Sequence, residues 1–190
     1  MIFYLALKMP AMAASIENQI DLIAKEAATL KLGFGHYILG MKLSEAQQEQ
    51  ARQHPMDKSL EGTYKFKDGE IFIVATAEDD IVLGVYKEYP EITMDEIKNI
   101  VGTMMLEHGE PTLSAHDKMI YWIFDENGKI ERDTFAKSKD SESLESLATV
   151  KFSSSERIGS VPEKESEPIS AYLMITSDPL SKLFLAKEKQ

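Results

Sequence analysis

The sequence predicts an α+β protein, an antiparallel sheet with helices packed on one face, built from two related helix-plus-meander units. Two capped helix starts, at Ser44–Gln47 and Thr93–Glu96, predict the helices, and each is followed by short segments of alternating apolar and polar residues. Tight-turn residues such as Asp68-Gly69 separate these segments, which is typical of antiparallel hairpins. Because one helix covers a small sheet incompletely, the two units are expected to share a core.

The length and composition fit one domain, or two small subdomains with a shared core. Of the 190 residues, 43% are apolar and 28% are charged, which is ordinary for a globular protein. The absence of cysteine excludes disulfides, thiolate metal sites and cysteine nucleophiles. The formal net charge of −11 disfavours nucleic acid as a partner, because phosphate binding depends on Lys and Arg. No segment approaches the ~18 apolar residues of a membrane span, so an integral membrane protein is not expected.

The N-terminal segment, residues 1–14, has features of the end of a secretory signal. An apolar run covers residues 2–7, and Ala11-Met12-Ala13 matches the small-x-small pattern before a signal-peptidase site. The run is shorter than a usual signal core, and no basic residue precedes it. The segment therefore predicts either a signal-peptide remnant, cleaved after Ala13, or an apolar segment that packs on the core of an uncleaved protein.

The first unit is predicted to span residues 15–90 and to contain two helices. Apolar residues at near-helical spacing predict an amphipathic helix over 15–32, with Ser15 as its N-cap and glycines after its end. The second helix begins at the Ser44 capping box and is polar, which is typical of a surface position. It is expected to end before Pro55, because proline disfavours helical backbone in the preceding residue.

The rest of the first unit is predicted to form three antiparallel strands between residues 63 and 89. Tyr64 and Phe66 alternate with lysines in the first of these strands, and a tight turn follows it. The acidic residues 78–80 form the next turn, and Gly84 in the last strand is expected to mark a bulge. These segments predict a meander.

The second unit is predicted to span residues 91–178, and a short tail follows over 179–190. Its helix begins at Thr93 and ends at Gly109, with one continuous apolar face made by Ile97, Ile100, Val101, Met104 and Met105. Strands are expected over 119–124, 128–135, 147–153 and 169–177. A long polar loop is expected before the last strand, and a short helix in the tail.

Two runs in these units, LGMKLSEAQ at residues 39–47 and YWIFDENGKI at residues 121–130, resemble the helix start and the strand passage of small bacterial envelope modules. These are the β-lactamase-inhibitor-protein-like modules, a form also found in the small lipoprotein of the outer-membrane barrel-assembly machinery. The resemblance covers about residues 36–135 as two tandem units. It implies two helices on one face of an antiparallel sheet, and protein binding rather than catalysis. It carries over no functional residue, and the cysteine of a lipoprotein anchor is absent.

No arrangement of residues predicts catalysis, a metal site or a cofactor. The four histidines include no pair at metal-binding helical spacing, and His108 falls in a last helical turn, where histidine interacts favourably with the helix dipole. Asp79 and Asp125 are carboxylates of the kind an acid–base pair needs, but both lie in predicted turns, where aspartate stabilises the backbone locally. The sequence therefore favours a binding protein over an enzyme.

The aromatic strand over 119–124 is the best candidate for recognition. Alternation sends Tyr121 to one sheet face, and Trp122 and Phe124 to the other. The face that does not meet the core is expected to present aromatic side chains to a partner, so these three residues are the candidate binding surface. The alternative is that both faces are covered and all three residues belong to the core.

Two functions of different class follow from these observations. The first is a non-enzymatic exported protein of the bacterial envelope, periplasmic or secreted, that binds another protein or a small apolar ligand through a sheet face. The alternative is a cytoplasmic protein, a small-molecule binder or an enzyme, with an enclosed apolar pocket. A cleaved N-terminus distinguishes the first, and a large apolar pocket that contains an ionisable residue distinguishes the second.

Overall fold

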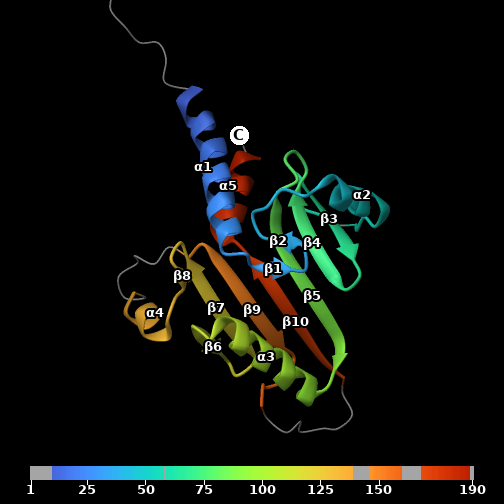
Figure 1. Ribbon diagram of the computed structural model, residues 1–190, viewed down its shortest axis with the longest axis vertical. Helices are drawn as coiled ribbons and strands as arrows, with labels where there is room; N and C mark the ends of the chain where they lie inside the picture. The colour runs from blue at the N-terminus through green and yellow to red at the C-terminus, as the bar shows by residue number, and fades with distance from the viewer. Residues whose placement is uncertain (1–9, 58, 139–145, 160–167, 189–190) are drawn as a thin grey trace, which may run out of the picture.

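The computed structural model of the chain describes residues 10–57, 59–138, 146–159 and 168–188 (Figure 1). Within these residues the chain forms a sheet of eight strands, a separate two-stranded hairpin and five helices. The recorded strand pairs are all antiparallel. The α+β fold class that the sequence predicts is therefore confirmed.

The large sheet consists of two antiparallel meanders that meet at its centre. Across the sheet the strand order is β3, β4, β5, β10, β9, β7 and β6, and β8 pairs with β7. The first meander follows α2 and the second follows α3, so each half of the sheet comes after one capped helix. The strand bounds are β3 Thr63–Asp68, β4 Ile71–Thr76, β5 Val82–Ile92, β6 Leu113–Ala115, β7 Met119–Asp125, β8 Gly128–Lys129, β9 Ala148–Ser154 and β10 Ile169–Thr176. The division into two related helix-plus-meander units remains a prediction.

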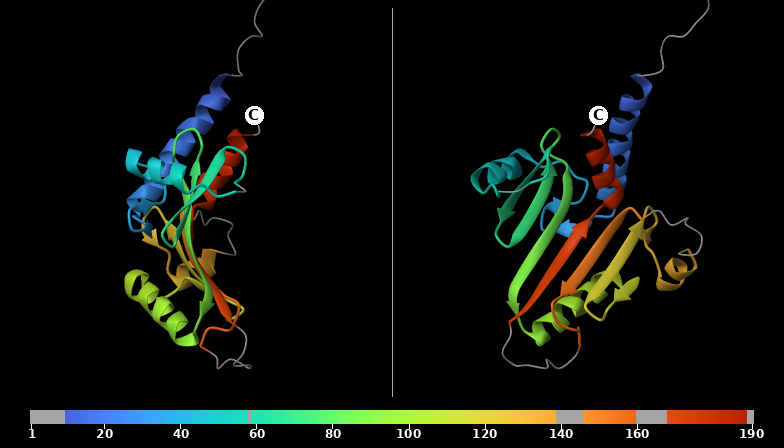
Figure 2. Two further views of the ribbon diagram at one scale, coloured as in Figure 1. Left: turned by 90° about the vertical axis from the view of Figure 1, so that its right-hand side faces the viewer. Right: turned by 180° about the vertical axis from the view of Figure 1, so that it is seen from behind.

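The helices lie on both sides of this sheet. α3 covers one face, on the same side as α2 and the β1–β2 hairpin, whereas α5 lies beside α1 at one end of the sheet (Figure 2). The bounds are α1 Pro10–Thr29, β1 Gly33–Phe34, β2 Tyr37–Ile38, α2 Glu45–Gln53, α3 Met94–His108, α4 Arg132–Ser138 and α5 Asp178–Lys187. Among the described helices, none has the length and apolar character needed to cross a membrane.

The main core lies between α3 and the sheet, and one row of paired residues shows how it is built. Ile97, Val101 and Met104 of α3 pack against this row. Directly paired residues on neighbouring strands point to the same sheet face, so the whole row points to the side of the sheet on which α2 and α3 lie (Figure 2). The row runs from β3 to β7 and consists of six buried residues: Phe66, Ile73, Val85, Ile175, Val150 and Trp122. A second, smaller cluster joins α1 to α5.

Both predicted capping boxes are present. The Ser44 hydroxyl accepts a hydrogen bond from the backbone N–H of Gln47, and the Gln47 side chain accepts one from the backbone N–H of Ser44. Thr93 and Glu96 make the same reciprocal pair at the start of α3. These bonds satisfy backbone donors that a helix start otherwise leaves without partners. α3 also ends at Gly109, as the sequence predicts.

Replacing Thr93 by alanine is expected to lower the free energy of unfolding by about 1 kcal/mol, because the substitution removes the cap of α3. The measurement is the urea midpoint followed by far-UV circular dichroism. The matched control is Thr103→Ala, since the Thr103 hydroxyl only donates to the Asn99 carbonyl within the same helix. An unchanged midpoint for the Thr93 variant would contradict the role assigned to the cap.

Two predictions about the N-terminal helix are wrong. α1 begins at Pro10, so Ser15 lies inside the helix rather than at its N-cap. Proline is favourable in the first turn, and the alanines that follow it have high helix propensity. The helix ends at Thr29 instead of residue 32, and Lys31, with a φ of 54°, takes the left-handed conformation expected of a glycine. Gly33 belongs instead to the β1–β2 hairpin, which the sequence does not predict.

The return strand predicted over residues 128–135 is also wrong. β8 has only two residues, and α4 begins at Arg132. The last hydrogen bond to the sheet runs from the Ile130 N–H to the Ile123 carbonyl. Beyond it, charged residues and alanine with good helix propensity favour a helical turn over pairing at a sheet edge. The tail helix is present as α5, and residues 160–167 of the predicted long loop lie outside the described residues.

Candidate functional site

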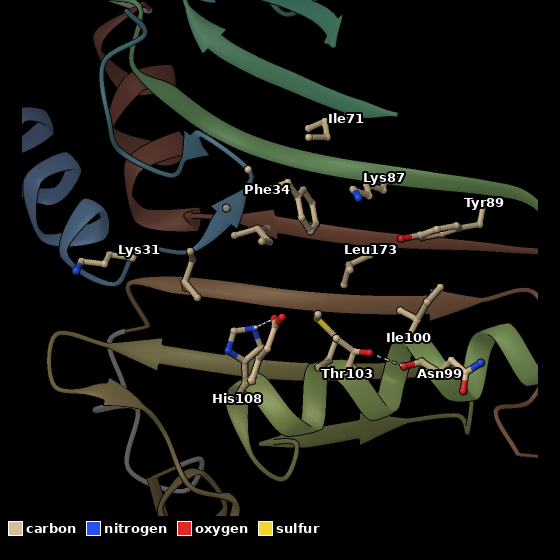
Figure 3. A pocket seen from close by; sticks show the side chains of 16 residues that line it. Lys31, Phe34, Ile71, Lys87, Tyr89, Asn99, Ile100, Thr103, His108 and Leu173 are labelled. Atoms are coloured by element: carbon tan, nitrogen blue, oxygen red, sulfur yellow. Dashed lines mark hydrogen bonds and ion pairs between the residues drawn. The ribbon is translucent and has the colours of Figure 1, made fainter. Parts of the chain in front are cut away.

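A cleft of about 510 Å³ lies between α3, the β1–β2 hairpin and the sheet (Figure 3). This α3 cleft is defined by Phe34, Lys87, Tyr89, Ile100, His108 and Leu173 among its lining residues. Its volume falls within the range of small-molecule binding sites. The cleft is the larger of the two recorded in the described residues.

The floor of the α3 cleft comes from three neighbouring strands. Ile71 on β4 pairs with Lys87 on β5, and Lys87 pairs with Leu173 on β10, so these three side chains point to the face that α3 covers. Ile100 of α3 and Phe34 of β1 form opposite walls (Figure 3). The floor of the cleft is therefore apolar apart from one lysine, whereas the rest of its lining also includes charged and polar residues: Lys31, Asn99, Thr103, Glu107 and His108.

Lys87 is the cation on this floor. It is half-buried, and its ammonium group lies 5.3 Å from the centroid of the Phe34 ring. Among the described residues, Lys87 has no recorded ion pair with a carboxylate. A cation–π contact compensates only part of the cost of removing an ammonium group from water. An anionic group in the cleft would give Lys87 the partner that the protein does not supply.

Tyr89 places a neutral hydrogen-bond donor at one end of the same cleft (Figure 3). Burial raises the pKa of its hydroxyl, and the nearby Glu70 carboxylate raises it further. The hydroxyl therefore stays protonated at neutral pH and is able to donate to an acceptor in the cleft.

His108 closes the other end of the cleft, in the last turn of α3 as the sequence predicts. Burial lowers its pKa below the ordinary 6.5, Glu107 opposes this shift, and Lys129 adds to it. The imidazole lies against the rings of Trp122 and Phe124, at centroid distances of 6.2 and 5.6 Å. His108 is therefore neutral at pH 7, so its interaction with the helix dipole is weaker than that of a charged histidine.

The lowered pKa of His108 predicts that the protein loses stability on mild acidification. The unfolded chain takes up a proton near pH 6.5, whereas folded His108 takes one up only at lower pH. The free energy of unfolding is therefore expected to be greatest above pH 6.5 and to fall as the pH drops toward the folded-state pKa. Urea midpoints measured between pH 7.5 and 5 test this. His108→Gln should flatten the dependence, and an equally steep dependence in that variant would contradict the assignment, since the other three histidines are exposed.

The structure separates the three predicted binding residues. Trp122 is 0% exposed and Phe124 is 7% exposed, so both belong to the core beneath α3. The Trp122 indole N–H donates to the Gly109 carbonyl at 2.9 Å, which satisfies its polar atom within the protein. Tyr121 points to the opposite sheet face and is half-buried, with the Lys151 ammonium 5.5 Å from its ring centroid. Of the three, only Tyr121 lies on a surface.

The functional side chains of the α3 cleft were not found by sequence reasoning. Lys87 lies in β5 two residues after the buried run 82–85, and Phe34 lies between two glycines that were expected only to end a helix. One signal of the cleft was present in the sequence: Lys87 lies two residues after Val85 and therefore on the same face of the strand. A charged residue that points toward the core is costly unless an opposite charge or a ligand compensates it.

The comparisons with known proteins identify no relative: no family model, curated protein or solved structure matches the chain. The resemblance to inhibitor-protein-like modules therefore remains a prediction. In the part of the chain that the structure describes, no group of three or more His, Asp or Glu side chains is placed to hold a metal ion. The function is thus argued from the geometry of the clefts and faces.

Proposed function

We propose that this protein is a non-enzymatic binding protein that holds a small amphipathic anion in the α3 cleft. The observation that carries the proposal is Lys87, a half-buried cation without a carboxylate partner among the described residues, between Ile71 and Leu173 on the floor of the cleft. The apolar part of the ligand would contact Leu173 and Ile100, and its acidic group would pair with Lys87. Tyr89 would donate a hydrogen bond to the same acidic group.

Replacing Lys87 by methionine is expected to weaken the binding of a fluorescent probe, 11-(dansylamino)undecanoate, about tenfold, because a charge-assisted contact is lost while the side-chain stem remains. Titration of the probe by its fluorescence gives the affinity. Lys25→Met, at an exposed position on α1, is the matched control and should bind the probe as the native protein does. Equal affinity in the Lys87 and Lys25 variants would show that the probe does not use the cleft.

A second variant tests the cleft itself rather than its charge. Thr103→Trp puts an indole at an exposed position of α3 beside the cleft, where it would occupy the space of the ligand without disturbing the core. Probe binding should be lost in this variant while its urea midpoint stays close to that of the native protein. Retained binding would place the probe elsewhere and would contradict the proposed site.

We further propose that the protein is exported to the bacterial envelope, as the N-terminal residues predict. Residues 1–9 of the signal-like segment lie outside the described residues. Cleavage after Ala13 would shorten α1 but would keep Ile20, Ala24 and Ala27, which are buried residues in the part of α1 whose side chains the structure describes. The intact mass of the native protein from fractionated cells tests this. A periplasmic species that lacks residues 1–13 supports export, and a full-length cytoplasmic species favours the cytoplasmic alternative.

A further inference from the structure

The sheet face opposite α3 carries a second row of paired residues that differs in character from the core row. This row is one residue out of step with the core row, so its side chains point the other way. Lysine and aromatic side chains predominate in it. From β3 to β7 its members are Lys67, Phe72, Tyr86, Met174, Lys151 and Tyr121.

No described helix lies in front of this part of the sheet, which is seen from behind in Figure 2, away from α5. The open face is defined here by its exposed and half-buried long side chains: Lys65, Lys67, Tyr86, Tyr121, Lys151 and Tyr172. Tyr172 is 43% exposed, which is unusual for an aromatic residue in a central strand with no functional contact.

The lysines of the open face cover its aromatic rings. The Lys65 ammonium lies 4.8 Å from the centroid of the Tyr86 ring, and the Lys67 ammonium lies 4.8 Å from that of Phe72. Phe72 and Tyr86 are stacked, with centroids 4.7 Å apart. Among the described residues, neither these lysines nor Lys151 has a recorded ion pair. The open face therefore presents lysine ammonium groups that are held in position by the aromatic rings beneath them.

This cationic character is opposite to that of the chain as a whole, whose formal net charge is −11. Glu88, which pairs with Tyr172, is an acidic residue on the same face, and Asp125 follows Tyr121 on that face at the end of β7. We propose that the open face binds an extended acidic segment of a partner protein, laid across the strands. Its carboxylates would pair with the lysines, and its apolar side chains would contact Tyr86, Met174 and Tyr121.

The spacing of the lysines sets the spacing of acidic residues in the partner. Four strand intervals separate β3, which carries Lys67, from β9, which carries Lys151, a distance of about 19 Å, or about six residues of extended chain. A segment with two acidic residues about six positions apart, and apolar residues between them, would reach both lysines at once. A compact acidic ligand would reach only one of them.

A protein segment suits this face better than the other polyanions. A nucleic acid carries a charge on every nucleotide and would continue beyond the open face onto an acidic surface, where it would be repelled. An anionic membrane would favour protruding apolar side chains, whereas the rings of Phe72 and Tyr86 lie flat under lysines.

The test is selection of linear peptides from a displayed random library on the full-length protein, with counter-selection on a Lys67→Glu, Lys151→Glu double variant. Enriched peptides are expected to carry two acidic residues about six positions apart. Measured by fluorescence anisotropy, their affinity should fall about tenfold or more in the double variant and should weaken with salt. A Lys25→Glu, Lys42→Glu variant makes the same change of net charge at exposed positions elsewhere and should bind as the native protein does.

Three results would overturn the proposal. One is enrichment of peptides without acidic residues, or no enrichment at all. Another is equal binding to the double variant and the native protein. The third is that oligothymidylate, or vesicles containing phosphatidylserine, bind more tightly than the selected peptides and depend in the same way on Lys67 and Lys151. That result would assign the open face to nucleic acid or to a membrane. Because the α3 cleft lies on the other sheet face, none of these results bears on ligand binding there.

Discussion

Replacing Trp122 by alanine is expected to lower the free energy of unfolding by about 3–5 kcal/mol, the usual cost of truncating a fully buried tryptophan. Two losses combine in this variant. The core row loses its largest side chain beneath α3, and the Gly109 carbonyl loses the indole N–H that donates to it at 2.9 Å. Since small domains are stable by about 5–15 kcal/mol, this single change should bring the protein close to unfolding.

The measurement for Trp122 is a urea titration followed by far-UV circular dichroism, because the chain has only one tryptophan and the variant therefore has no indole fluorescence. Trp122→Phe is the control. It keeps most of the apolar volume and loses the hydrogen bond together with a smaller part of the ring, so it should cost about 1–3 kcal/mol, less than the alanine variant. If the alanine variant had the same urea midpoint as the native protein, Trp122 would not be a core residue. The prediction that it belongs to a binding surface would then be favoured again.

The local features of the fold were predictable because they depend on residues close together in the chain. The Thr93 capping box involves residues three positions apart, and the turn after Asp68 joins adjacent strands. The pairing of β5 with β10 was not predictable in this way. Its partners, such as Val85 and Ile175, are far apart in the sequence, and apolar strands of similar pattern carry no local signal of which neighbour each will take.

For the candidate site too, the sequence predicted what depends on local geometry but not which segments come together. Alternation correctly separated Tyr121 from Trp122, since that depends only on strand geometry. It did not reveal which face α3 would cover, because both faces of β7 carry apolar side chains. The α3 cleft was still harder to predict from the sequence. It forms where the unpredicted β1–β2 hairpin approaches α3, and its walls come from segments that are distant in the chain.

The two proposed binding surfaces lie on opposite faces of the sheet. On the face under α3, a lysine lies between apolar side chains on the floor of a cleft, which suits one acidic group on a small ligand. On the open face, lysines lie in a row over aromatic rings, which suits several carboxylates on an extended chain. The β5 strand carries residues of both, because Lys87 and Tyr86 are adjacent and point to opposite faces.

Gly33→Ala is expected to remove ligand binding in the α3 cleft and to lower the free energy of unfolding by about 3 kcal/mol, at the upper end of the usual cost of overpacking. A Cβ at Gly33 would lie 2.0 Å from the Tyr37 carbonyl oxygen and 2.9 Å from the Ile38 Cα, across the β1–β2 hairpin. Both obstacles are backbone atoms, so the hairpin itself must move. Phe34, which forms one wall of the cleft and contacts Lys87, would move with it.

The matched control for Gly33 is Gly102→Ala on α3, where an added Cβ meets no atom within 4 Å and the φ angle is not positive. Alanine there should raise the free energy of unfolding by about 0.5–1 kcal/mol, because it has the higher helix propensity, and should leave binding unchanged. Affinity for 11-(dansylamino)undecanoate and the urea midpoint are measured on both variants. Native affinity in the Gly33 variant would mean that the hairpin is not a wall of the binding site, since the alanine cannot fit without displacing it.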